Sequence, residues 1–216
     1  MKRKAEGWNV ILAGFWNRPI FTPEWVAERV FHHSDFETYV ASLPVLSIVF
    51  DDRVVSLEVS HAQLLFRPMK LADDEGLARA EQMAGDVLKA LPETPVQAVG
   101  VNFSYIEDFP PDHLVAVFND NDPRDLNTMG WTTNERKISR RLVQDDETLN
   151  LTITYDGKSV TFDLNYHTEA TTNEVAGKAV RSGRVTTLRR QGFELIQRVF
   201  LLETEEGGND DNICGG

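Results

Sequence analysis

Short apolar runs rich in β-branched residues, separated by turn residues, dominate the first half of the chain. Side chains that alternate between apolar and polar in this way are typical of strands with one buried face. The apolar residues within 77–91 instead repeat every three or four positions, which predicts a helix that begins at Asp73. Thr22, followed by a proline, predicts the start of a shorter helix over 23–32. Strands are expected over 8–15, 46–50, 54–59, 63–67 and 96–105.

The second half of the chain shows the same order of patterns. A lead strand is followed by a polar loop over 119–130, a three-strand meander and a closing helix. The Asp156-Gly157 pair between the last two strands is a strong hairpin signal. We interpret 168–177 as a loop, and apolar residues at steps of three and four predict a long helix over 180–202. Strands are expected over 113–118, 136–144, 148–155 and 159–166.

The two halves are similar enough to suggest an internal repeat. Asp51-Asp52 and the strand after it align at one constant offset with Asp145-Asp146 and its following strand. Two unrelated amphipathic hairpins can also align this well, so both interpretations stay open. We predict an α+β fold of two similar halves, each an antiparallel meander closed by a helix; their strands could join into one continuous curved sheet with helices on one face. The expected segments are an N-terminal half over 1–105, a C-terminal half over 106–203 and a disordered acidic tail over 204–216.

The chain is acidic, with 34 Asp and Glu residues against 22 Lys and Arg residues and a formal net charge of −12. This charge disfavours nucleic acid and anionic membranes as partners. The single cysteine, Cys214, cannot form an internal disulfide, which is typical of a reducing compartment. Because no apolar run approaches the roughly 20 residues of a membrane span, we predict a cytoplasmic protein that does not enter a membrane.

Motifs of the common enzyme classes are missing from the sequence: there is no Walker loop, no GxGxxG and no HExxH pair. The run His32-His33-Ser34-Asp35 is interpreted as a helix end, because sequence neighbours point apart whereas a catalytic triad needs converging groups. No histidine pairs with a cysteine at zinc spacing, so we predict no metal ligands, no cofactor and no catalytic residues. One enzymatic alternative stays open, a divalent cation held by Asp108, Asp112, Asp120, Asp122 and Asp125 of the 106–130 loop.

Two basic stretches stand out against the acidic background. Arg181, Arg184 and Arg190 lie on the last helix or its approach, with few acidic residues beside them. They could pair with the acidic first half or the acidic tail, within one chain or across a dimer, or contact another acidic partner or a phosphate backbone. We predict them as partner-binding residues. The nucleic-acid alternative uses Arg136, Arg140 and Arg141, which alternate partly on one predicted strand.

Two further segments could serve partners. Trp16 follows Phe15 in the first strand, so alternation places it on the exposed side, and Trp25 lies nearby on the short helix. An exposed tryptophan favours partner contacts, although Trp16 could also cover the end of the core. The chain ends in Gly215-Gly216, which would suit a ubiquitin-like modifier because glycine lets a tail enter a narrow conjugating site.

These patterns predict a non-enzymatic, cytoplasmic interaction or regulatory protein that acts through protein–protein contacts. Its partner would be another protein or a second copy in a homodimer. The first alternative is a nucleic-acid-binding protein that uses the basic strand and the last helix. The second alternative is a ubiquitin-like conjugated modifier that uses the terminal glycines.

Overall fold

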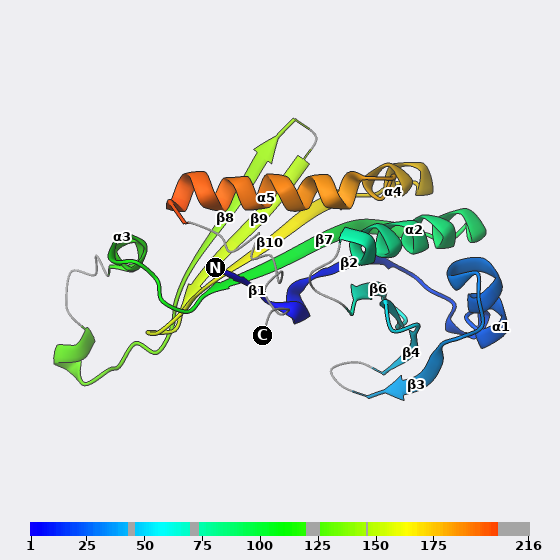
Figure 1. Ribbon diagram of the computed structural model, residues 1–216, viewed down its shortest axis with the longest axis horizontal. Coiled ribbons are helices and arrows are strands. Elements are labelled where there is room, and N and C mark those ends of the chain that lie inside the picture. Colours follow the sequence, from blue (N-terminus) through cyan, green and yellow to red (C-terminus); the bar gives the residue numbers. More distant parts are fainter. Residues whose placement is uncertain (43–45, 70–73, 120–125, 146, 203–216) are drawn as a thin grey trace, which may run out of the picture.

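A ten-stranded antiparallel sheet forms the body of the computed structural model (Figure 1). The structure describes residues 1–42, 46–69, 74–119, 126–145 and 147–202. The order of strands across the sheet is β3-β4-β5-β6-β2-β7-β10-β9-β8, and β1 also pairs with β7. The strands are β1 (Lys2–Arg3), β2 (Asn9–Gly14), β3 (Glu37–Ala41), β4 (Ser47–Asp51), β5 (Val55–Val59), β6 (Gln63–Pro68), β7 (Val96–Glu107), β8 (Arg136–Gln144), β9 (Glu147–Tyr155) and β10 (Val160–Glu169).

Two long helices, α2 and α5, lie on one face of this sheet and contact each other near their N-terminal ends (Figure 1). α2 packs on β2 and β6, and α5 packs on β7 together with the short α4. The α-helices are α1 (Pro23–Val26), α2 (Asp74–Ala90), α3 (Asp112–Val115), α4 (Asn173–Ala179) and α5 (Arg184–Phe200). A π-helical turn, η3 (Ala27–Phe31), follows α1, and short 3-10 turns are η1 (Ala5–Gly7), η2 (Arg18–Ile20), η4 (Ala116–Phe118) and η5 (Leu126–Met129).

The same connections occur on both sides of the β2–β7 pair. β2 pairs with β6, the last strand of the meander β4-β5-β6, and α2 follows that strand. β7 pairs with β10, the last strand of the meander β8-β9-β10, and α4 and α5 follow it. The predicted α+β fold, with meanders closed by helices in one sheet and helices on one face, is confirmed. The division at 105/106 stays a prediction, and that point falls inside β7.

The core lies between the sheet and its helices. Along β7, alternate side chains from Val99 to Tyr105 are buried beneath the helix layer, with Phe103 between them. Trp8 meets the rings of Phe103 and Tyr105 edge-on, with centroids 5.1 and 5.5 Å apart. Burial of these alternate side chains keeps one face of β7 toward the helices.

On the opposite face of the sheet, four asparagines form a ladder across the centre. Asn150 of β9 donates to Asn165 of β10, Asn165 to Asn102 of β7, and Asn102 to Asn9 of β2, at 3.0, 2.6 and 2.7 Å. These residues are direct cross-strand partners. Gly100 leaves room for the ladder, because a Cβ there would lie 3.3 Å from the amide nitrogen of Asn165.

Two segments of the second half differ from the sequence prediction. The predicted strand over 113–118 is helical, formed by α3 and η4, because Pro111 caps the turn and its carbonyl accepts the N–H groups of Leu114 and Val115. The predicted loop over 168–177 contains α4, whose N-cap, Thr172, accepts the N–H of Val175.

The predicted helix over 180–202 starts four residues later than expected, as α5. Gly183, its N-cap, has a φ of 80°. That left-handed conformation separates α5 from the preceding α4, and glycine adopts it without steric cost.

Gly14 allows the end of β2 to approach the start of β7. A Cβ at this position would lie 2.5 Å from the carbonyl oxygen of Pro95, a backbone atom that cannot move independently. We expect Gly14→Ala to lower the free energy of unfolding by about 1–3 kcal/mol. The matched control is Gly177→Ala in α4, where nothing lies within 4 Å of the added Cβ. Because alanine has a higher helix propensity than glycine, the free energy of unfolding of this control should be unchanged or about 1 kcal/mol higher. Denaturant unfolding measures the free energy of unfolding of both variants. Equal changes in Gly14→Ala and Gly177→Ala would contradict the close approach of β2 to β7 at Gly14.

Candidate functional site

The two tryptophans predicted to bind partners lie against the core. Trp16 is 1% exposed and its indole N–H donates to a main-chain carbonyl of β2 at 3.1 Å, whereas Phe15 is 61% exposed. The expected exposure of Trp16 is therefore wrong. The alternation itself continues past the end of β2, with Val10, Leu12 and Trp16 buried on one side, so the error was to take Phe15 as the buried residue. Trp25 is partly buried and packs edge-on against Phe21, with ring centroids 5.0 Å apart.

The three arginines predicted on the last helix have different surroundings. Arg184, the first residue of α5, forms an ion pair with Glu147 at the start of β9. Arg181 and Arg190 are exposed, and no ion pair within the part of the chain that the structure describes involves them. Arg184 is thus paired within the chain, but with a carboxylate of the second half and not of the acidic first half or tail. Partner binding by Arg181 and Arg190 stays a prediction.

A buried carboxylate caps the N-terminus of α5. Glu81 of α2 is 3% exposed and accepts the N–H of Gly183 at 2.7 Å and that of Val185 at 2.8 Å. A carboxylate is stabilised at this end of a helix by the free N–H groups and by the helix dipole. Arg189 of α5 and Asp74 of α2 form a second link at 3.1 Å. Both contacts join the helix of one half to the helix of the other.

We expect Glu81→Ala to destabilise the protein by about 2–4 kcal/mol, because the buried N–H of Val185 and the part-buried N–H of Gly183 would lose a charged acceptor. Gln82→Ala, a change at the exposed neighbour on the same helix, is the matched control and should alter stability by less than about 0.5 kcal/mol. Denaturant unfolding measures both variants. A similar loss in the two variants would contradict the capping role of Glu81.

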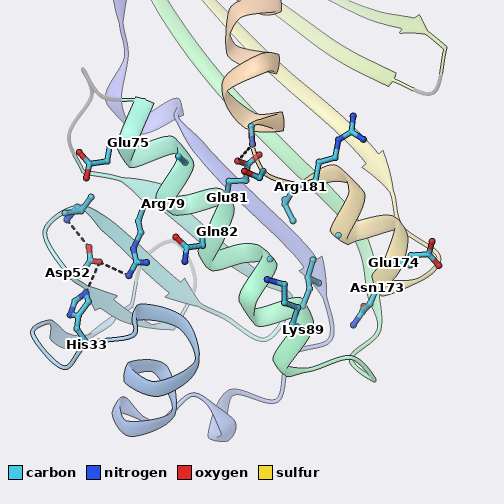
Figure 2. Close-up of a pocket in the computed structure, with 18 residues that line it drawn as sticks. His33, Asp52, Glu75, Arg79, Glu81, Gln82, Lys89, Asn173, Glu174 and Arg181 are labelled. Carbon is cyan, nitrogen blue, oxygen red and sulfur yellow. Dashed lines mark hydrogen bonds and ion pairs between the residues drawn. The ribbon is translucent and has the colours of Figure 1, made fainter.

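A groove of about 1200 Å³ runs over the outer surface of α2 (Figure 2). Asp52 lies at one wall with its side chain 3% exposed. One carboxylate oxygen accepts the N–H groups of Val54 and Val55, and the other lies 3.5 Å from His33 and 4.0 Å from Arg79. The His33–Asp52 pair anchors the segment after η3 to the β4–β5 turn, which is a structural role.

A second ion pair supports the same segment. His32 lies 3.2 Å from Asp86 of α2, which also accepts a hydrogen bond from Lys89 at 2.9 Å. Burial alone would raise the pKa of Asp86, but the hydrogen bonds from Lys89 and His32 outweigh it and hold this pKa below its ordinary value. The two histidines predicted at a helix end thus each contact a carboxylate of another element.

The acidic loop contributes little to a cation site in the residues described. Asp108 forms an ion pair with Lys2 at 2.9 Å. Within the described ranges there is no group of three or more histidine, cysteine, aspartate and glutamate side chains able to hold a metal ion. Several residues of the sequence predictions lie outside the described residues: Asp120, Asp122, Asp125, Cys214, Gly215 and Gly216.

The basic strand of the sequence analysis is β8, and it forms one edge of the sheet. Within the described part of the chain β8 pairs with β9 alone. Arg136 is partly buried, whereas every residue from Ser139 to Gln144 is exposed, including Arg140 and Arg141. The backbone N–H and C=O groups along an edge strand are a template for a further strand.

Apolar side chains accompany the charges on this edge. Val143 is 66% exposed and Leu142 is 36% exposed. Trp131, in the segment that leads into β8, is 68% exposed. None of these residues was predicted from the sequence, although a tryptophan in a polar segment without apolar periodicity was a signal for Trp131. The edge therefore combines a side that pairs with no other described strand, cations and apolar contact area.

No helix in the described ranges is long and apolar enough to cross a membrane. Comparison of the sequence with protein-family models and with curated proteins found no match.

Proposed function

We propose that this protein binds another protein by receiving an extended, acidic segment of it as an additional strand on β8. The observation that carries the proposal is the nine-residue edge strand β8, which pairs on one side and is exposed from Ser139 to Gln144. Strand addition uses backbone hydrogen bonds for affinity and alternate side chains for specificity.

The positive charge of β8 favours an acidic strand as its binding partner. β8 contains Arg136, Lys137, Arg140 and Arg141 and no acidic residue, in a chain with a formal net charge of −12. Basic residues on an edge strand also deter non-specific pairing. Because their sign is uniform, they disfavour most strands but attract an acidic one, and salt should weaken this attraction.

A second copy of β8 is a poor occupant. Antiparallel pairing centred on Arg140 would place the two Arg140 side chains opposite each other, and any register would bring together two strands that each carry four cations and no acidic residue. Like charges directly opposite each other destabilise a strand pair. The partner-binding proposal therefore favours a different protein over a homodimer through this edge.

The test uses a labelled nine-residue peptide of alternating valine and glutamate, and fluorescence anisotropy at low salt. We expect the double variant Arg140→Glu/Arg141→Glu to bind it at least about tenfold more weakly, since the central charge of the edge changes from attractive to repulsive for the peptide. The control Arg198→Glu, at an arginine of α5 whose side chain is 81% exposed, should change binding less than about twofold.

Two further probes make the result decisive. The valine–lysine counterpart of the peptide should not bind, and hydrogen exchange should slow at β8 amides when the glutamate peptide is present. Equal binding to the double variant and the wild type would overturn the proposal. Tighter binding of single-stranded DNA than of the peptide would also overturn it, in favour of a nucleic-acid interface on the same arginines.

A further inference from the structure

We infer that β8 selects its partner by the order of side chains in the incoming strand, which runs antiparallel to β8. The incoming strand has acidic residues opposite Lys137, Arg140 and Arg141. It has apolar residues opposite Ile138 and Leu142. This inference rests on the proposed function and names the class of partner. It follows from the different surroundings of the two faces of β8, because an added strand extends both faces of the sheet at once.

One face of β8 continues the polar side of the sheet. Lys137, Ser139 and Arg141 pair with Thr154, Thr152 and Asn150 of β9. Asn150 is the end of the asparagine ladder, so Arg141 extends that row to the edge. An incoming strand finds two cations separated by a hydroxyl on this face. Carboxylates opposite Lys137 and Arg141 and a small polar residue opposite Ser139 complement that pattern.

The other face of β8 continues the apolar side. Ile138 pairs with Ile153 and Leu142 with Leu149, and these two β9 residues are buried. Ile138 is partly buried against the core, while Leu142 is 36% exposed. Apolar side chains on an incoming strand would cover both and enlarge the buried surface.

Arg140 interrupts this apolar side. It lies between Ile138 and Leu142 on the same face, pairs with Leu151, and is exposed. A carboxylate opposite Arg140 neighbours another opposite Arg141, so the matching strand has two adjacent acidic residues, one on each face. This doublet departs from simple alternation and defines the register of the pairing.

Direction follows from hydrogen-bond geometry. Every described strand pair in this sheet is antiparallel, and antiparallel ladders are slightly more stable per residue than parallel ones. The strand that matches β8 from Val143 back to Lys137 therefore reads valine, leucine, glutamate, glutamate, threonine, isoleucine, glutamate.

The first experiment compares three end-capped peptides of this single composition by titration calorimetry with the full chain. They are the matching order, the reversed order, and a shuffled order that places glutamates opposite Ile138 and Leu142. We expect the matching peptide to bind at least about tenfold more tightly than the shuffled one and more tightly than the reversed one. Equal affinities for matching and shuffled peptides would overturn the inference, while loss of all three affinities in Arg140→Glu/Arg141→Glu would still support the proposed function.

The second experiment tests the register by charge exchange. Arg141→Glu should weaken the matching peptide, and a lysine in the third position of the peptide, opposite residue 141, should restore binding. A lysine in the fourth position, opposite Arg140, is the matched control and should not restore it. Rescue by both peptides or by neither would overturn the register. Failure of any acidic peptide to bind the wild type would overturn both the inference and the proposed function.

Discussion

The antiparallel pairing of β2 with β7 is the contact on which the remaining architecture depends. It joins two meanders into one sheet, so α2 and α5 cover the same face and contact each other above the β2–β7 pair. There Glu81 caps α5, and Arg189 pairs with Asp74. Because most of the apolar burial lies on that side, the centre of the opposite face can carry a polar ladder. The same pairing carries β3 and β8 to the far ends of the sheet.

Local signals in the sequence were sufficient for most of the meander strands. Asp156-Gly157 predicted a hairpin, and Gly157 has the positive φ that such a turn needs. The segment 113–118 was misassigned because a short apolar run does not distinguish a buried strand from a helix by its period. α4 was missed although Thr172 is a good N-cap, since its short sequence has little apolar periodicity.

The candidate site was only partly predictable. Arg136, Arg140 and Arg141 were recognised as a basic strand, but their position at an edge depends on pairing between distant segments, which spacing along the chain does not reveal. The error at Trp16 has a local origin, because Phe15 was taken as buried, whereas Trp16 shares the buried side with Val10 and Leu12. Charge and strand formation were thus available from sequence, whereas edge position and side-chain face required the fold.

The asparagine ladder helps to fix the register in which β2 pairs with β7. All three ladder bonds point the same way, from β9 toward β2. Turning one amide over would oppose nitrogen to nitrogen on one side and oxygen to oxygen on the other, so the four amides reverse together or not at all. A slip of one residue between β2 and β7 would move an asparagine onto the apolar face. The neighbouring asparagines would then lose their hydrogen-bond partner. The ladder therefore penalises mispaired sheets independently of helix packing.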